Sequence, residues 1–352
     1  MKGAPPEVAA ARASGLRYVL DDRPGFSRET FRNGFRYRDE HGRLIRAAGT
    51  LARIRHMAIP PAWTDVWICP IENGHLQATG RDARGRKQYR YHEAWAYVRG
   101  DGKFERIVAF GSRLPHLRAA LRKSLAQPGF PRDKVLAMVV AVLADTLIRI
   151  GNESYARENK SFGLTTLRNR HVAFAKNGRA RFKFTGKSGQ IHDIVLDDAR
   201  LVAEIKKCQQ LPGQSLFQYL DDDGNTVPVD SGEVNEWLRE VMGEAFTAKD
   251  FRTWAGTSMA FRLFARTPLP EPVSVDASAS RALAQVEKSV VGDIAEALGN
   301  TLTVCRKSYI DPVVFAAWRE GALSRYADKA RGARQWEQHT LAFLRKRHRQ
   351  HP

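Results

Sequence analysis

The residues best suited to chemistry are a tyrosine near the end of the chain and a set of cations ahead of it. Tyr309 follows Arg306-Lys307-Ser308, and a polar turn preceded by a glycine lies nine positions upstream. A tyrosine in such a place, taken alone, usually packs its ring and solvates its hydroxyl. The cations that change this interpretation are Arg149, Lys187, Lys249 and Arg252. A tyrosine and several cations are what transesterification of a phosphodiester requires when no metal takes part.

These side chains match the steps of such a reaction. A free tyrosine has a pKa of about 10, so an attacking phenolate needs cationic neighbours or removal of its proton. The pentacoordinate phosphorane carries additional negative charge, which arginine guanidiniums can bind at its equatorial oxygens. A lysine can supply the proton that the leaving alkoxide needs. The sequence has neither a metal-ligand cluster nor a glycine-rich phosphate loop, so we expect no metal and no nucleotide cofactor.

The helix that must position Arg149 begins at Pro131-Arg132-Asp133. Apolar side chains then recur at three- and four-residue spacing, from Val135 to Leu143, as expected of a helix with a buried face. Arg149 would lie close to the C-terminal end of this helix. The alternative is that Arg149 only caps backbone carbonyls there, where the helix dipole favours a cation.

Lys187 is predicted at the tip of a β-hairpin. Three short strands, at 172–174, 181–184 and 191–195, are separated by turns that contain glycine. A lysine at a hairpin tip is ordinarily just exposed to solvent. A tip that must reach over a bound backbone and retract would have the same sequence.

Lys249 and Arg252 are predicted near the start of a further helix. Thr247-Ala248-Lys249-Asp250 resembles a capping box. At positions i and i+3 the two cations would share one face near a helix N-terminus, where the helix dipole also favours an anion.

Size and charge favour a two-domain protein that binds a polyanion. The chain has 352 residues, more than a single core usually holds, and 43% of them are apolar. The net charge of +19 is self-repulsive unless a polyanion offsets it, so nucleic acid is the expected partner, ahead of an anionic membrane. We see no signal peptide and no apolar run that could span a bilayer. Three widely spaced cysteines form neither a disulfide framework nor a zinc site, which favours the cytoplasm.

The composition divides the chain into four segments and indicates an α+β protein. Residues 1–16 are expected to form a loose N-terminal arm, and residues 17–98 a β-rich N-terminal domain with a hairpin that turns at Asn73-Gly74. Residues 99–105 are expected to be a linker. Residues 106–352 would form a larger, mainly helical domain with a small antiparallel sheet. Its tail is expected to be a basic amphipathic helix that either binds DNA or packs on the domain.

A basic stretch with interleaved aromatic and amide side chains lies at 81–92. This composition is typical of a surface that holds phosphates and touches base edges, although a solvated basic loop would share it. We expect the contact residues in this stretch to be Arg86, Lys87, Gln88, Tyr89 and Tyr91.

From about Tyr18 to its end, the chain resembles the small type IB DNA topoisomerases of bacteria and poxviruses. The resemblance rests on several motifs in the same order over nearly the whole chain. These motifs are Ile59-Pro60-Pro61-Ala62-Trp63, Lys87-Gln88-Tyr89, Arg149-Ile150-Gly151-Asn152, Gly163-Leu164-Thr165-Thr166-Leu167, Phe184-Thr185-Gly186-Lys187, Lys249-Asp250-Phe251-Arg252-Thr253 and Lys307-Ser308-Tyr309.

The resemblance implies an enzyme that relaxes positive and negative supercoils by nicking one DNA strand, without ATP or metal. The second domain would have the catalytic fold shared by tyrosine recombinases and type IB topoisomerases. With the N-terminal domain it would form a monomeric clamp around double-stranded DNA in the nucleoid.

The resemblance also implies a role for each site residue. Tyr309 looks like the nucleophile that forms a 3′-phosphotyrosyl link and frees a 5′-hydroxyl. Arg149 and Arg252 fall on the two transition-state arginines, Lys187 on the lysine that protonates the leaving oxygen, and Lys249 on a basic residue that assists this step. Gln88, Tyr89 and Tyr155 fall where the family contacts bases in the major groove.

Asn300 departs from the family pattern, because the position nine before the nucleophile is commonly histidine. An amide NH2 can donate a hydrogen bond to the same non-bridging oxygen but does not titrate near neutrality. We therefore expect Asn300 to keep the donor role and to lose any pH dependence that a histidine would contribute.

Two other classes of protein share part of this pattern. A tyrosine site-specific recombinase uses a similar constellation, but its N-terminal domain is helical and it needs paired specific sites. A non-catalytic architectural DNA-binding protein would need only the charge, and it would be indifferent to Tyr309→Phe.

Overall fold

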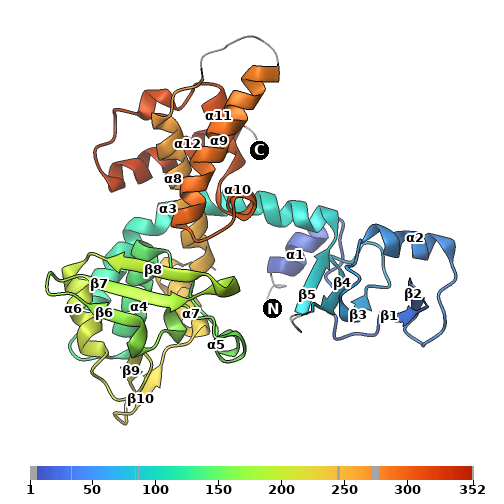
Figure 1. Cartoon of the computed structure of the whole chain (residues 1–352), viewed down its shortest axis with the longest axis horizontal. Helices are drawn as coiled ribbons and strands as arrows, with labels where there is room; N and C mark the ends of the chain where they lie inside the picture. The colour runs from blue at the N-terminus through green and yellow to red at the C-terminus, as the bar shows by residue number, and fades with distance from the viewer. Residues whose placement is uncertain are drawn as a thin grey trace. The chain divides into compact units, whose positions relative to one another are not determined.

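A computed structural model describes residues 6–32, 34–83, 85, 87–243, 246–270 and 277–350 (Figure 1). The chain forms two compact units, Met1–Phe104 and Glu105–Pro352. The first is built on an antiparallel sheet and the second is mostly helical with a small sheet, which confirms the predicted α+β class. Within the described ranges, no helix combines the length and the apolar character needed to cross a membrane.

The first unit contains a five-stranded antiparallel sheet with the strand order β2-β1-β3-β4-β5. Its strands are β1 (Phe26–Phe31), β2 (Gly34–Arg38), β3 (Thr64–Ile68), β4 (Leu76–Arg81) and β5 (Lys87–Tyr91). The predicted turn at Asn73-Gly74 does connect two paired strands, β3 and β4. Helix α2 (Ala48–His56) contributes Ile54 to a core that includes Ile68 and Ala78.

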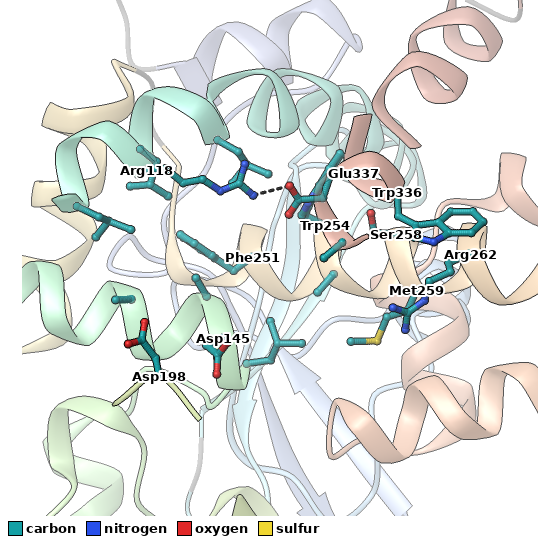
Figure 2. Close-up of a pocket in the computed structure, with 18 of the residues that line it drawn as sticks. Arg118, Asp145, Asp198, Phe251, Trp254, Ser258, Met259, Arg262, Trp336 and Glu337 are labelled. Atoms are coloured by element: carbon teal, nitrogen blue, oxygen red, sulfur yellow. Dashed lines mark hydrogen bonds and ion pairs between the residues drawn. The ribbon is translucent and has the colours of Figure 1, made fainter. Parts of the chain in front are cut away.

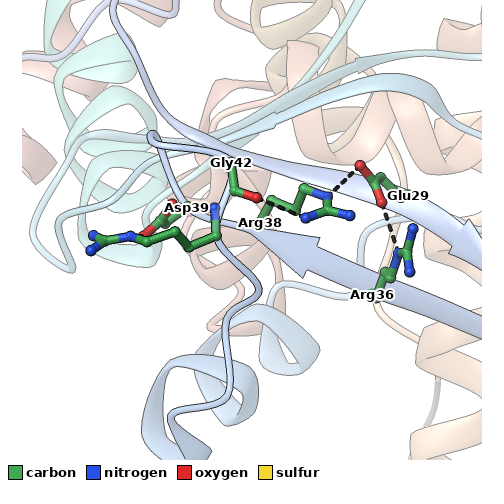
Figure 3. Close-up of polar contacts among 6 residues, drawn as sticks. Glu29, Arg36, Arg38, Asp39 and Gly42 are labelled. Carbon is green, nitrogen blue, oxygen red and sulfur yellow. Dashed lines mark hydrogen bonds and ion pairs between the residues drawn. The ribbon is translucent and has the colours of Figure 1, made fainter.

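Two arginines of β2 share one carboxylate of β1. Glu29 accepts hydrogen bonds from Arg36 Nε (2.8 Å) and Arg38 Nε (2.6 Å), and Arg38 also donates to Gly42 O at 2.7 Å (Figure 3). These hydrogen bonds lower the pKa of Glu29 from its ordinary value. Because Glu29 lies directly opposite Arg36, the pair also favours the observed β1–β2 register.

Two segments differ from the sequence-based expectation. The arm expected to be loose, residues 1–16, contains helix α1 (Pro6–Ala13), and Ala11 and Leu16 pack with Trp95. Burial of these apolar groups stabilises a helix that composition alone does not reveal. Residues 99–105, expected to be a linker, are helical and lie inside helix α3 (Glu93–Leu125), although the boundary between the two units, after Phe104, does fall within these residues. Helix formation is cooperative, and a glycine lowers the stability of a helix by only about 1 kcal/mol, so the glycines of this segment do not end α3.

In the second unit, helix α4 (Arg132–Thr146) is buried on most of its surface and packs against a three-stranded sheet (Figure 1). The sheet has the order β6-β7-β8 and consists of β6 (Val172–Phe174), β7 (Ala180–Thr185) and β8 (Ile191–Leu196). Further elements around it are α5 (Glu153–Asn159), α6 (Ala199–Cys208), α7 (Ser231–Met242), β9 (Gln218–Leu220) and β10 (Thr226–Pro228).

The helices at the C-terminal end of the chain pack around helix α8 (Ala248–Arg266). It begins at the predicted capping box, where Asp250 Oδ2 accepts hydrogen bonds from Thr247 N (2.8 Å) and Oγ1 (3.0 Å). The helices in contact with it include α9 (Ala277–Ala297), α10 (Leu302–Tyr309), α11 (Pro312–Arg319) and α12 (Ala333–Gln350). Trp336 and Phe343 of α12 pack against Phe261 of α8, so the basic tail packs on its own unit.

Candidate active site

Arg149 lies in an irregular segment that follows α4. The helix ends at Thr146, and Leu147 has a left-handed conformation (φ 55°), so α4 ends three residues before Arg149. Glycine at position 163 lets another backbone segment approach. A Cβ on Gly163 would lie 2.5 Å from Arg149 O, and this carbonyl accepts a hydrogen bond from Leu164 N at 2.9 Å. The contact between the backbone at Arg149 and the backbone at Gly163 and Leu164 therefore sets the position of Arg149.

The side chain of Arg149 reaches the end of α9 and does not cap α4. Its Nη2 donates to Gly299 O (3.0 Å) and to Asn300 Oδ1 (2.6 Å). Asn300 N in turn donates to Ala295 O at 2.8 Å, which fixes the backbone of this turn on α9. Because its oxygen accepts from Arg149, the amide of Asn300 presents Nδ2 as a donor.

Arg252 is buried in α8, with 5% of its surface exposed. Its Nη1 donates to Leu147 O and its Nη2 to Leu298 O at 2.5 Å. These carbonyls follow the C-terminal ends of α4 and α9, where orphan oxygens need donors. Arg252 therefore ties together the two segments that carry Arg149 and Asn300.

Tyr309 ends α10 and packs closely on α8. A Cβ on Gly256 would lie only 2.6 Å from Tyr309 O, so the glycine permits this approach. Thr257 Oγ1 donates to the same carbonyl at 3.2 Å. The Arg252 Cζ lies 5.2 Å from the centre of the Tyr309 ring, within the range of a cation–π contact. The tyrosine backbone is thus held from α8 while its half-buried ring faces a guanidinium.

Three buried nitrogen atoms of this cluster have no hydrogen-bond partner among the described residues. They are Arg149 Nη1, Arg252 Nε and Asn300 Nδ2. Burial and the neighbouring charge of Arg252 lower the pKa of Arg149, although a guanidinium stays protonated at any working pH. Unpaired buried donors and adjacent positive charges are costly, and a phosphodiester would satisfy both. The cluster is therefore a candidate phosphate site beside Tyr309.

Lys187 and Lys249 differ from the cluster because they are exposed. Lys187 lies at the tip of the β7–β8 hairpin, as predicted, beside Ser188 with a φ of 63°. Lys249 is in the first turn of α8. The pair expected on one face of this helix is therefore divided by burial, with Arg252 inside the cluster and Lys249 at the surface.

Three residues that position the cluster were missed in the sequence. They are Gly256, Thr257 and Glu287. Glu287, in α9, is 1% exposed and forms ion pairs with Arg306 (2.7 Å) and Arg319 (2.5 Å). Glu287 thereby joins α10 and α11 to α9. Of the three, only Gly256 could be noticed in the sequence, because a glycine inside a helix is unusual. The contacts of Thr257 and Glu287 join different helices, and the local sequence does not reveal them.

A cavity of about 430 Å³ on another face of α8 does not contain the predicted catalytic residues (Figure 2). It is lined from α3, α4, α6, α8 and α12, and the Arg118–Glu337 ion pair lies at one side. None of the residues that line it belongs to the cluster around Tyr309, so the cavity and the candidate phosphate site are separate.

The expected DNA-contact residues of β5 lie on an edge strand. Tyr89 and Tyr91 are 47% and 38% exposed and their rings stack with 6.0 Å between centroids. Exposed aromatic faces of this kind can stack on bases or sugars.

The polar neighbours on β5 are already paired. Lys87 Nζ lies 2.5 Å from Asp21 Oδ2, which raises the pKa of Lys87, and Gln88 Nε2 donates to Asp82 at 2.9 Å. Arg86 lies outside the described residues. Tyr155 is part of α5, but its side chain is also outside the description.

The cluster around Tyr309 combines a tyrosine with two guanidiniums and an amide, the types of group that transfer of a phosphodiester to a tyrosine requires. Residues 93–322 match the family model of the eukaryotic DNA topoisomerase I catalytic core, and residues 34–82 match that of the bacterial DNA topoisomerase IB N-terminal domain. The chain is 35% identical to DNA topoisomerase 1B of Acanthamoeba polyphaga mimivirus, over 74% of this chain and 77% of the relative. It is 23% identical to DNA topoisomerase 1B of vaccinia virus (strain Copenhagen), over 73% and 78%. The chain belongs to the type IB DNA topoisomerases.

Proposed function

We propose that Tyr309 is the residue through which this topoisomerase cleaves and rejoins DNA. A type IB enzyme relaxes supercoils through a transient nick in one strand, with the 3′-phosphate held on a tyrosine. The observation that supports Tyr309 is the adjacent set of unpaired donors from Arg149, Arg252 and Asn300.

In the proposed reaction, the Tyr309 hydroxyl releases its proton to solvent, and its oxygen attacks the phosphorus as the bond from phosphorus to the 5′-oxygen breaks. Arg149 and Arg252 would bind the non-bridging oxygens, and Asn300 Nδ2 would donate to one of them. The guanidiniums are held on backbone and amide oxygens, which would keep them oriented while charge develops on a bound phosphate.

Lys187 would protonate the leaving 5′-oxygen, with assistance from Lys249. A hairpin tip suits this role, since the lysine must approach a backbone that has just bound. The bond energy would be retained in the tyrosyl ester, so religation would need neither ATP nor a metal.

The N-terminal unit would contribute DNA contacts through Tyr89, Tyr91, Lys87 and Gln88, together with Arg86. The paired state of Lys87 and Gln88 implies that DNA would have to compete with Asp21 and Asp82. Tyr155 would add a contact from the second unit. We further propose a monomer that acts on chromosomal DNA in the cytoplasm.

Relaxation of supercoiled plasmid in EDTA, without ATP, tests this proposal. Wild type should relax both signs of supercoiling on plasmids of unrelated sequence, and Tyr309→Phe should relax neither. A recombinase would instead act only on plasmids that carry paired specific sites. Equal relaxation by wild type and Tyr309→Phe would exclude Tyr309 as the nucleophile.

A further inference from the structure

The imidazole of His192, on β8, fits between two glycines that adjoin predicted catalytic residues. A Cβ on Gly186 would lie 2.4 Å from His192 Cδ2, and a Cβ on Gly299 would lie 2.8 Å from His192 Cε1. The ring also stacks on Phe184, with 5.0 Å between centroids and 21° between planes. Neither glycine could be replaced without displacing the ring or its neighbours.

The position of these glycines connects two parts of the site. Gly186 immediately precedes Lys187 at the hairpin tip, and Gly299 immediately precedes Asn300. Gly299 O also accepts the hydrogen bond from Arg149. The His192 ring therefore bridges the support of the proposed general acid and the turn of the proposed phosphate site.

The electrostatic surroundings favour an uncharged ring. Burial lowers the pKa of His192 most, and the positive charges of Arg149 and Arg252 lower it further. A neutral ring adds no third cation beside the two guanidiniums and can pack on Phe184 as a flat apolar surface.

We propose that His192 is a positioning residue, whose ring docks the Lys187 hairpin on the Gly299–Asn300 turn and so sets the reach of Lys187 to the leaving oxygen. This inference rests on the roles proposed above for Lys187 and Tyr309. It predicts a defect confined to proton delivery, which a general loss of structure would not produce.

Two substrates distinguish a defect in proton delivery from a general loss of structure. One is a duplex with an ordinary scissile phosphodiester, and the other has sulfur in place of the bridging 5′-oxygen. In the second, the bond from Tyr309 oxygen to phosphorus forms while the phosphorus–sulfur bond breaks. The sulfur leaves as a thiolate without a proton, because a thiol has a pKa of only about 8.5.

Single-turnover cleavage by His192→Ala should be about tenfold or more slower on the ordinary duplex, since general-acid catalysis contributes about 10² to 10⁴. On the sulfur duplex its rate should be close to that of wild type, as should the rate of Lys187→Ala. His192→Phe keeps a flat ring and should recover most of the rate on the ordinary duplex.

His171→Ala is the matched control. His171 is a buried histidine next to β6 whose ring also lies near Phe184, but the side chains nearest to a Cβ on Gly186 or Gly299 include His192 and not His171. It should cleave both duplexes at nearly the wild-type rate. Thermal melting of each variant would identify any that is unfolded.

A steric test uses Gly186→Ala, whose φ of −100° any residue can adopt. The added methyl should slow the ordinary duplex in wild type, and it should have a smaller effect when His192→Ala has removed the ring. Equal effects in both backgrounds would contradict the docking contact.

The inference is overturned if His192→Ala cleaves the ordinary duplex at the wild-type rate, if it is equally slow on both duplexes, or if His192→Phe is as slow as His192→Ala. If the proposed function itself is wrong, the result is different, because the wild-type protein would form no Tyr309-dependent adduct on either duplex.

Discussion

Arginines in the two units are held in opposite ways. Arg36 and Arg38 of the N-terminal sheet bind the carboxylate of Glu29, so their charge is partly neutralised (Figure 3). Arg149 and Arg252 of the second unit bind carbonyl and amide oxygens, which orient the guanidiniums without neutralising them.

This difference indicates what each set can do. An arginine paired with a carboxylate at the surface contributes only about 0–1 kcal/mol to stability and has little charge left for a ligand. A buried arginine held by neutral oxygens keeps its full charge, and here each one also keeps an unpaired nitrogen. Unpaired buried donors cost stability, and an anion bound at the site would offset that cost.

Among these variants, Arg252→Ala should slow cleavage most. It should reduce the single-turnover cleavage rate by about 10³-fold, because one preorganised donor to a transition-state oxygen contributes about 10² to 10³ and this residue also fixes two segments. Arg36→Ala, at saturating DNA, should leave the rate nearly unchanged. Equal losses in the two variants would contradict the comparison.

Asn300→Ala should slow cleavage and religation by about 10²-fold through loss of its donor. Asn300→Asp should be at least as slow, because a carboxylate cannot donate and repels phosphate. Rates of both steps should be measured between pH 6 and 9. An unchanged rate for Asn300→Ala would show that Nδ2 does not contact the phosphate.

The same contrast applies to two carboxylates that each bind two arginines. Glu287 is 1% exposed, whereas the side chain of Glu29 is 38% exposed. Glu287→Ala should lower the free energy of unfolding by about 2–3 kcal/mol, since hydrogen bonds to a buried charge are lost. Glu29→Ala should lower it much less, because its ion pairs are exposed to solvent. Urea unfolding of each variant measures the difference, and similar losses would mean that burial does not decide the strength of these pairs.

The smallest effect expected is from Gly256→Ala, which should slow cleavage by about tenfold because displacement of Tyr309 disturbs alignment for attack. The matched control is Gly292→Ala in α9, where the added Cβ would meet only Leu302 Cδ2 at an ordinary 3.9 Å. The control should cleave normally. A normal rate for Gly256→Ala would show that the close approach of α8 and Tyr309 is not needed for catalysis.

Local patterns in the sequence predicted the elements that carry the site. The capping box at Thr247-Ala248-Lys249-Asp250, the Asn73-Gly74 turn and the Lys187 hairpin all depend on neighbouring residues, and the structure has each of them. The catalytic assignments came from the family resemblance, and the structure brings Arg149, Arg252, Asn300 and Tyr309 into one cluster.

The remaining features depend on contacts between segments that are distant in the sequence. The end of α4 at Leu147, the packing of Gly256 on Tyr309 and the ring of His192 between Gly186 and Gly299 are examples. A helical periodicity in the sequence does not reveal the residue at which tertiary contacts end the helix. Likewise, a glycine pattern does not state which side chain occupies the space that the missing Cβ leaves.

Trapping the covalent complex on a duplex labelled at either end of the scissile strand tests whether Tyr309 is the nucleophile. Wild-type protein, mixed with DNA in EDTA and stopped with SDS, should retain the strand on the 5′ side of the nick through a 3′-phosphate, and peptide mapping should place the link on Tyr309. Tyr309→Phe should form no adduct. An adduct on the other strand fragment, on a different residue, or undiminished in Tyr309→Phe would rule out a 3′-phosphotyrosyl link through Tyr309.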